Sequence, residues 1–380
     1  MKLSVSFVRG FFCALAVMAW SASAGAATHA PKKAGPPLQT VKTFNNFHLV
    51  GIAVSREGHI FASAPAAKVG NKVVEIDAKT GAMTPFPNQS WNSSSGTNAQ
   101  REWSVPQAMW VDKADHLWVL DSGVVTISSE SHGVPPKLVE FDLADHNKVI
   151  RSYGFGGAVA PSDSLNDVRV DLVHGYAYLT NIANKGSLVV LNLKTGQSRQ
   201  VLVGDRSTLA SAKSHFMMPD GEPAKGPSGK PLAIQADGIA LSPDAAWVYY
   251  RPLTDHNYWR VPTAALVDES LSPAALAKKV QFLGTGPMTG GLIMDERGTL
   301  YGGDLEHASV MAMTLDPSTH RLKSKLFVRD EGKLSWADGF SISNGYLYIA
   351  DSHLWEVSFK NHLPRSGPFT IFKVKLPQPA

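Results

Sequence analysis

The feature that most constrains the fold is a two-strand unit that recurs along the chain. Each copy has an alternating apolar segment, a short turn containing Gly, Asp or Asn, and a second segment rich in Tyr, Trp, Val and Ile. This pattern predicts an antiparallel β-hairpin. The copies start roughly 50 to 70 residues apart. They cover residues 51–63, 108–123, 167–181, 237–252, 291–304 and 337–351.

Most hairpins are followed by two more strand-like segments. Examples are KVVEIDAKTGAMTPF at 72–86 and SLVVLNLKTGQSRQVLV at 187–203. Four short strands in each of six repeats, with little helical periodicity, predict an all-β chain folded as a six-bladed β-propeller. The one helix that we expect, residues 267–280, is an insertion in the fourth blade.

Closing such a ring requires the two ends of the chain to meet, because an open edge strand promotes aggregation. The segment LQTVKTF, residues 38–44, precedes the first hairpin and is predicted to complete the sixth blade. Residues 38–380 are therefore predicted to form a single propeller domain, preceded by a flexible tail over residues 27–37.

Residues 1–26 have the pattern of a secretory signal peptide. Lys2 and Arg9 precede an apolar run too short to span a bilayer, and small residues follow it. We therefore expect a periplasmic or extracellular protein with no membrane anchor. The single cysteine, Cys13, lies in this leader, so the mature chain would have no disulfide partner.

The charge balance gives no indication of a nucleic-acid partner. The formal net charge is +4, and removal of Lys2 and Arg9 with the leader reduces it to +2. The remaining basic residues are scattered rather than arranged in a stripe. We expect a small-molecule ligand and no nucleic acid.

Polar residues precede several of the predicted inner strands. The first strand of each blade lines the central channel of a propeller, so the residues at its start lie at the channel mouth. Convergent polar side chains in such a cavity indicate a ligand site, although Asp and Asn at strand ends also form local turns. Two tryptophans beside these positions would either form aromatic walls or pack between blades. The candidate ligand-binding residues are Asn166, Asp167, Asp237, Asp338, Trp336 and Trp103.

A second set of polar residues ends the outer strand of each hairpin on the same face. These residues are expected to bind local backbone N–H groups rather than a ligand. They are Asp121, Asn181, Asp304 and Asp351.

Two long connections without a strand pattern are predicted on the mouth face. Residues 205–232 join the third and fourth blades, and residues 87–103 precede the second. Connections of that length are usually functional or disordered. The longer one is predicted to fold over the mouth as a lid.

Other catalytic patterns are missing from the sequence. There is no Gly-x-Ser-x-Gly, no His-Glu-x-x-His and no cysteine pair for zinc. Any catalysis would have to come from the carboxylate and amide cluster, alone or with a calcium-type divalent cation.

Several stretches resemble the Yellow and major royal jelly protein family. They include WSVPQAMWVDKADHLWVLDSG at 103–123 and ADGFSISNGYLYIADSHLW at 337–355, and they lie in the family's order between about residues 40 and 360. The resemblance implies a secreted six-bladed propeller. Relatives include pigment-pathway proteins, some associated with dopachrome conversion, carriers of aromatic amines in the central cavity, and nutritive proteins. Its Ala-rich leader and lack of the insect members' cysteines make the chain look like a bacterial relative.

A more distant resemblance is to the gluconolactonase and senescence-marker-protein propellers. It rests on the openings Asn166-Asp167, Asp237-Gly238 and Asp338-Gly339. In that family a blade-one glutamate joins later Asn and Asp residues around a divalent cation, which polarises a lactone carbonyl. By that resemblance the metal ligands here would be Asn166, Asp237 and Asp338. The chain departs from the pattern, because Leu49 and Val50 stand where the blade-one acid would be, and Glu102 is the nearest substitute.

Two hypotheses therefore stand side by side. In the first, the central cavity binds a small aromatic or cationic molecule, with aspartates supplying negative charge and tryptophan an aromatic face. In the alternative, the channel-mouth carboxylates hold a divalent metal in a lactonase-like hydrolase. Whether the chain is an enzyme stays open at this point.

Overall fold

The structure is a computed structural model that describes most of the chain after residue 31. It covers residues 32–378 except 68–69, 94–97, 126–129, 132–133, 184, 219–220, 227–228 and 355–367. The chain divides into two units, residues 1–31 and 32–380, and only the second is described. The predicted signal peptide, residues 1–26, and the start of the predicted tail lie outside the described residues.

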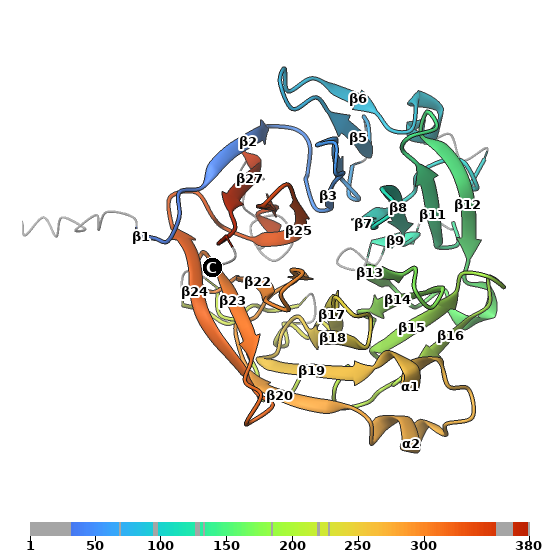
Figure 1. The fold of residues 1–380 in the computed structure, drawn as a ribbon, viewed down its shortest axis with the longest axis vertical. Helices are drawn as coiled ribbons and strands as arrows, with labels where there is room; N and C mark the ends of the chain where they lie inside the picture. The colour runs from blue at the N-terminus through green and yellow to red at the C-terminus, as the bar shows by residue number, and fades with distance from the viewer. Residues whose placement is uncertain are drawn as a thin grey trace, which may run out of the picture. The chain divides into compact units, whose positions relative to one another are not determined.

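The second unit is the predicted six-bladed β-propeller, with six antiparallel sheets arranged around a central axis (Figure 1). Blade one contains β3 (Ile52–Val54), β4 (Ile60–Ser63), β5 (Val73–Ile76) and β6 (Met83–Pro85). Blade two contains β7 (Pro106–Val111), β8 (His116–Asp121), β11 (Lys137–Asp142) and β12 (Lys148–Gly154). Blade three contains β13 (Leu165–Asp171), β14 (Tyr176–Asn181), β15 (Ser187–Asn192) and β16 (Ser198–Val201).

The other three blades follow in chain order. Blade four contains β17 (Ala236–Leu241), β18 (Trp247–Pro252), β19 (Asn257–Pro262) and β20 (Gln281–Thr285). Blade five contains β21 (Leu292–Met294), β22 (Leu300–Asp304), β23 (Ser309–Leu315) and β24 (Leu322–Asp330). Blade six contains β25 (Ala337–Ser343), β26 (Tyr346–Asp351), β27 (Phe369–Lys375) and β2 (Gln39–Phe44). A separate hairpin joins β9 (Val124–Val125) to β10 (Glu130–Ser131).

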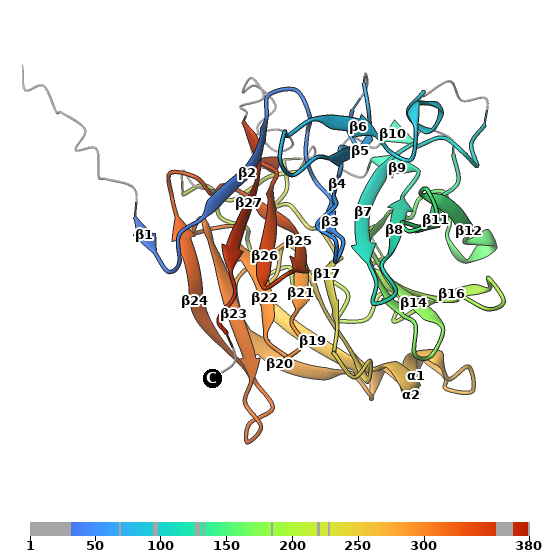
Figure 2. The same ribbon diagram turned by 45° about the horizontal axis from the view of Figure 1, so that its top comes forward.

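The first strand of every blade lies next to the axis. Each of these inner strands contacts the inner strands of the two neighbouring blades, so that they form a closed ring. Figure 2, tilted by 45°, shows the inner strands β3, β7, β17, β21 and β25 at the centre of the blades. The residues that begin the inner strands therefore face one another across the channel.

The ring is closed by the pairing of β2 with β27, as the sequence predicts. The pairing is antiparallel and aligns Phe44 with Phe369 and Gln39 with Lys373. The N-terminal segment thus supplies the outermost strand of the blade that the C-terminal segment builds. The backbone N–H and C=O groups of β2 and β27 pair with each other, so these strands do not leave the ring open.

The segment predicted to be a flexible tail, residues 27–37, contains a short strand in its described part. Strand β1 (Lys33–Ala34) pairs with β24 and adds a fifth strand to blade five. The Lys32 amide donates to Glu331 at 3.0 Å. Gly35, at φ 85°, lies so close to the Phe327 carbonyl oxygen that a Cβ would stand 2.1 Å from it. Only glycine allows this approach, and it brings the segment onto the blade edge.

The helical insertion differs from the prediction of one helix over residues 267–280. The structure has two short helices, α1 (Thr263–Val267) and α2 (Pro273–Ala277). Asp268 accepts hydrogen bonds from the amide and hydroxyl of Ser270, which forms a turn between them. Ser272 caps α2 and Pro273 occupies its first turn, both of which favour a new start. Within the described residues, no helix is both long and apolar enough to cross a membrane.

The closing strand is anchored by Phe44, which is 4% exposed and lies 5.1 Å from the Phe47 ring. Truncation by Phe44→Ala is expected to cost about 3 to 5 kcal/mol of unfolding free energy, because it leaves a cavity at the seam. Urea unfolding measures the loss. The control is Thr43→Ala on the exposed side of the same strand, which should change the free energy by less than about 0.5 kcal/mol. Equal effects of the two changes would contradict the role given to this seam.

Candidate functional site

The candidate site is a small cavity on the propeller axis, where the inner strands begin. Its volume is about 40 Å³, and five blades contribute to its wall. A space of that size holds a few water molecules or one small ionic group, and drug-sized ligands need several hundred Å³. The polar side chains in the wall are Gln107, Asn166, Asp167, Arg169 and Asp338.

Four inner strands are irregular at the positions that supply these side chains. Pairing with the second strand shifts between Pro106 and Ala108 in β7, and between Leu165 and Val168 in β13. It shifts in the same way between Ala236 and Ile239 in β17, and between Ala337 and Gly339 in β25. Such bulges free residues from the ladder and redirect their side chains, and they are frequent beside functional sites. Here the residues inside them are Gln107, Asn166, Asp167, Asp237 and Asp338.

Hydrogen bonds link three of these side chains across three blades. The Gln107 amide donates to the Asn166 oxygen at 3.1 Å, and the Asn166 amide donates to Asp237 Oδ1 at 2.8 Å. Asp237 is 4% exposed. The structure thus brings Asn166 and Asp237 together as predicted and adds Gln107, which the sequence analysis missed.

Asp167 is held by an arginine that lies deeper in the channel. Arg169 Nη1 donates to Asp167 Oδ1 at 2.8 Å, and Nη2 donates to the Leu292 carbonyl of blade five. Because Asp167 and Arg169 are two residues apart on one strand, they share the face that lines the axis. The guanidinium also lies 4.6 Å from the Trp110 ring. Arg169 thus forms the floor of the cavity and offsets the charge of Asp167.

Asp338 extends from blade six towards blade five. Two glycines give it room there, because a Cβ on Gly290 would stand 2.0 Å from Asp338 Oδ1 and one on Gly291 would stand 1.8 Å from the Asp338 carbonyl oxygen. The Gly-Gly opening of blade five therefore makes space for the carboxylate of its neighbour.

Burial raises the pKa values of all three aspartates. For Asp237 the pKa lies well above the usual value, because burial is reinforced by the negative charges of Asp338 and Asp167. Burial and the charge of Asp167 raise the pKa of Asp338 to about 7, against hydrogen bonding by Trp336 and Ser352. The rise at Asp167 comes from burial and is opposed by Arg169. The combined negative charge of the three aspartates exceeds the positive charge that neighbouring buried groups supply.

A second arginine lies near Asp237 and is fully buried. Arg251 Nη1 donates to the Thr289 carbonyl at 2.7 Å, and its guanidinium lies 4.9 Å from the Tyr258 ring. Burial lowers the pKa of Arg251, and the negative charge of Asp237 is among the influences that raise it. Arg251 offsets part of the carboxylate charge from outside the cavity wall.

The 205–232 connection, predicted to be a lid, packs against residues that flank the hairpin strands on the mouth face; residues 219–220 and 227–228 of it are not described. Its apolar side chains, among them Phe216 and Met218, join Trp336, Leu253 and Leu305 in one buried cluster. The Phe216 and Trp336 rings meet edge to face, 5.4 Å apart. This apolar cluster thus lies beside Asp338 of the cavity wall, through Trp336.

The two candidate tryptophans lie in different places. Trp336 is 1% exposed and belongs to the lid cluster, next to Asp338. Trp103 is also 1% exposed but packs against Trp91 between blades one and two, and its indole N–H donates to the Phe86 carbonyl at 2.9 Å. The structure therefore places Trp336 beside the cavity and Trp103 in the core, outside the cavity wall.

The residues that end the second strands bind backbone groups, as expected. Asp121 accepts from the amides of Ser104 and Val105 at 2.8 and 2.6 Å. Asn181 and Asp351 accept in the same way from the segments before their own inner strands. Asp304 pairs instead with His307, at 2.8 Å. Asp121, Asn181 and Asp351 thus position the starts of their own inner strands, and none of the four residues lines the cavity.

Comparisons with known proteins agree with this architecture. A family model described as major royal jelly protein matches residues 105–378, well over half of the chain. The chain belongs to the major royal jelly protein family.

The individual relatives have low sequence identity to this chain of the major royal jelly protein family. Major royal jelly protein 2 of Apis mellifera is 25% identical over 300 residues, which cover 73% of this chain and 61% of that protein. Protein yellow of Drosophila melanogaster is 26% identical over 206 residues, which cover 50% and 36%. The chain thus spans about half the length of the curated relatives it matches.

A solved gluconolactonase from Xanthomonas campestris has a similar fold. Its TM-score is 0.52 at 13% identity, and the alignment covers 92% of this chain and 96% of that one. At that identity the likeness concerns the fold alone. Both resemblances predicted from the sequence are therefore supported at the level of family or fold.

In this royal jelly family chain, the mouth residues do not form a ready-made metal site. Asn166 and Asp237 each use an oxygen in the hydrogen-bond chain from Gln107. Blade one contributes Val50, Gly51 and Ile52 to the wall, with no acid. Among the described residues, the group of His, Asp and Glu ligand atoms within 4.8 Å of one another lies elsewhere, in blade two.

The raised pKa of Asp338 predicts how stability depends on pH. Unfolding returns this group from a pKa of about 7 to its usual 3.8, so the folded chain binds more protons between those values. The free energy of unfolding should therefore fall as pH rises from about 4 to about 7. The Asp338→Asn variant should lack this contribution, so its unfolding free energy should decrease by a few kcal/mol less than that of the wild type over the same pH range. Urea unfolding at several pH values measures it, with Asp304→Asn as the control, and an unchanged slope in Asp338→Asn would refute the assignment.

Proposed function

We propose that this chain is a binding protein whose axial cavity takes the charged group of a small cationic molecule. The observation that carries the proposal is the convergence of three buried or half-buried aspartates at the axial cavity, where their charges oppose one another. Asp167 and Asp338 line the cavity, and Asp237 lies behind the wall, bound to the lining residue Asn166. A bound cation would relieve that repulsion. Backbone bulges and the Gly290 and Gly291 openings hold the carboxylates there.

The surroundings of the cavity support an amphipathic ligand. The polar space of about 40 Å³ accommodates an ammonium group but not a ring. Beside Asp338 lie the apolar side chains of the lid cluster, with the Phe216 and Trp336 rings among them. A primary aromatic amine fits this order, with its ammonium beside the aspartates and its ring among the lid residues.

Phenethylamine is a suitable probe, and 2-phenylethanol is its neutral counterpart. Phenethylamine should raise the unfolding midpoint of the purified protein at pH 8, and 2-phenylethanol should not, because only the amine carries a charge. Asp237→Asn should weaken amine binding at least about tenfold, since a lost charge partner in a buried site costs 2 kcal/mol or more. Isothermal titration calorimetry measures both constants.

The matched control is Asp304→Asn, on the same face but paired with His307 outside the cavity. This variant should bind the amine like the wild type. Equal binding of amine and alcohol, or equal loss in the two variants, would show that the cavity carboxylates are not the determinant.

Export is the second part of the proposal. It rests on the leader pattern of residues 1–26. A protein that meets its ligand outside the cytoplasm is consistent with a binding role.

A second candidate function is a metal-dependent lactonase that uses Asn166, Asp237 and Asp338. It is favoured by their origin in three different blades at the channel mouth and by the fold shared with a gluconolactonase. It has less support than amine binding, because the Asn166 oxygen accepts from the Gln107 amide and Asp237 Oδ1 accepts from the Asn166 amide, and blade one supplies no acid to the cavity wall.

Lactone hydrolysis distinguishes the two candidates. The binding proposal predicts no turnover of δ-gluconolactone above the spontaneous rate, with or without added calcium, measured by continuous titration of the released acid. Turnover that disappears on chelation and in Asp237→Asn, but persists in Asp304→Asn, would replace the binding proposal with the lactonase.

A further inference from the structure

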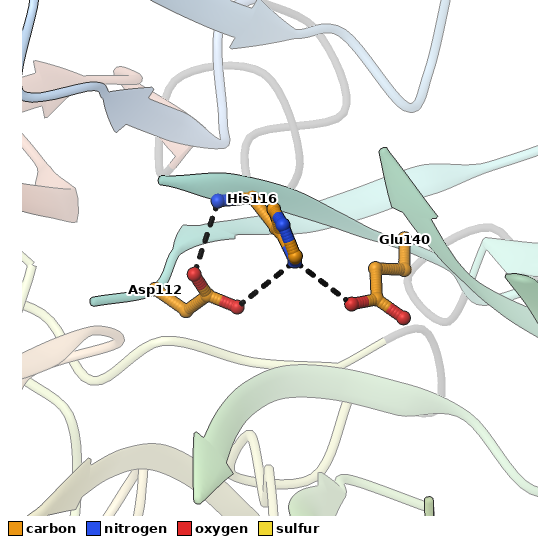
Figure 3. A group of neighbouring side chains, drawn as sticks. All are labelled: Asp112, His116 and Glu140. Carbon is orange, nitrogen blue, oxygen red and sulfur yellow. Dashed lines mark hydrogen bonds and ion pairs between the residues drawn. The ribbon is translucent and has the colours of Figure 1, made fainter. Parts of the chain in front are cut away.

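Blade two contains a group of three possible metal ligands, far along the strands from the channel mouth. Asp112 follows the inner strand β7, His116 begins β8, and Glu140 lies on β11 (Figure 3). His116 Nδ1 lies 3.0 Å from Glu140 Oε1 and 3.9 Å from Asp112 Oδ2. The imidazole nitrogen is thus directed between two carboxylates.

These separations suit one tetrahedral metal ion. A zinc ion with nitrogen and oxygen ligands at about 2.0 to 2.2 Å sets its ligand atoms about 3.3 Å apart. The two distances from His116 Nδ1, 3.0 and 3.9 Å, lie on either side of that value. All three ligand atoms lie within 4.8 Å of one another, so small side-chain rotations suffice to bind one ion.

Asp112 is fixed before any ion binds. Its side chain is 1% exposed. Oδ1 accepts from the amides of Ala114 and His116 at 2.8 and 3.0 Å, and Oδ2 accepts from the Trp118 indole at 2.7 Å. A hydrogen-bonded carboxylate of this kind is typical of an oriented metal ligand.

Glu140 supplies a carboxylate that the protein leaves incompletely satisfied. Its side chain is 11% exposed. One oxygen pairs with His116, and among the described residues the other oxygen accepts no hydrogen bond. Burial raises the pKa of Glu140, although His116 lowers it. Two buried carboxylates beside one imidazole form a site that a cation would stabilise.

Blade one provides an internal comparison. Its His59 and Glu75 occupy the corresponding positions, with Nδ1 2.6 Å from Oε1. Ser55 stands where blade two has Asp112 and binds the His59 amide at 3.1 Å, and Phe61 stands where blade two has Trp118. The histidine–glutamate pair is thus a shared feature of the two blades. The third carboxylate and the indole that orients it are present in blade two and absent from these positions in blade one.

We propose that Asp112, His116 and Glu140 bind a divalent transition-metal ion, with zinc the best match. Imidazole and carboxylate together suit zinc, whereas calcium prefers oxygen ligands alone. The ion takes the place of the contact between His116 Nδ1 and Glu140, and the neutral imidazole keeps its proton on Nε2. A water molecule completes the coordination on the side where His116 is 27% exposed. The ion joins the β7–β8 turn to β11 and thereby links three strands of the blade.

Zinc titration of the chelator-treated protein tests the proposal, with calorimetry and the unfolding midpoint as readouts. One equivalent should bind and raise the midpoint. Cobalt should give the visible absorption of a tetrahedral site. Both His116→Ala and Glu140→Gln should weaken zinc binding by more than about 100-fold, because even residues that only orient a ligand account for about 10- to 100-fold. Calcium should give no comparable shift.

The matched control is His59→Ala, which removes the equivalent histidine from blade one. This variant should bind zinc like the wild type, and so should Asp338→Asn at the channel mouth. Circular dichroism in chelator establishes that each variant is folded. The proposal is overturned if the wild type binds no zinc, or if His59→Ala reduces binding as much as His116→Ala does.

Discussion

The pairing of β2 with β27 is the interaction on which the rest of the structure depends. It joins the first described strands to the last and brings blade six against blade one. At that junction Gly339 lies so close to Val50 that a Cβ would stand 2.5 Å from the Val50 carbonyl oxygen. Val50 and Asp338 therefore become parts of one cavity wall only when the ring is closed. The site exists as a consequence of ring closure, which no single blade can supply.

The repeated blade explains why so much of the fold follows from the sequence. Alternating apolar residues and turn residues repeat six times, and the strand pairings agree with them. The mouth aspartates could also be placed, because their position at the start of inner strands follows from the repeat alone. Deviations from the repeat were harder to predict. The helix expected over residues 267–280 is interrupted before Pro273, and Lys33–Ala34 pair with an edge that belongs to a blade distant in sequence.

Side-chain direction was the other limit on prediction. Asp167 and Gln107 both lie in bulges, in β13 and β7. Asp167 was predicted because it is an acid at the start of an inner strand, whereas Gln107 and Arg169 line the same cavity without being acids and were missed. The two tryptophans occupy different positions relative to their inner strands. The carbonyl of Trp336, directly before β25, accepts from Ser352, and Val105 has the equivalent contact with Ser122 in blade two, so Trp103 lies two residues earlier. Trp103 packs between two blades and Trp336 packs in the lid cluster.

Polar residues lie at both ends of the inner hairpins, but they have different roles at the two ends. At the mouth, bulges break the strand pairing so that carboxylates converge in a cavity where burial opposes their charge. At the other end the pairing between the first two strands is regular in blades one and two, and polar residues there bind turn amides, as Asp112 and Ser55 both do. A buried, unbalanced carboxylate lowers stability unless something pairs with it. Asp237, Asp338 and Glu140 are therefore informative because turn geometry and strand pairing do not account for their charge. Asp121 and Asp351, by contrast, bind backbone amides, and Asp121 is also paired with Lys137 at 2.7 Å.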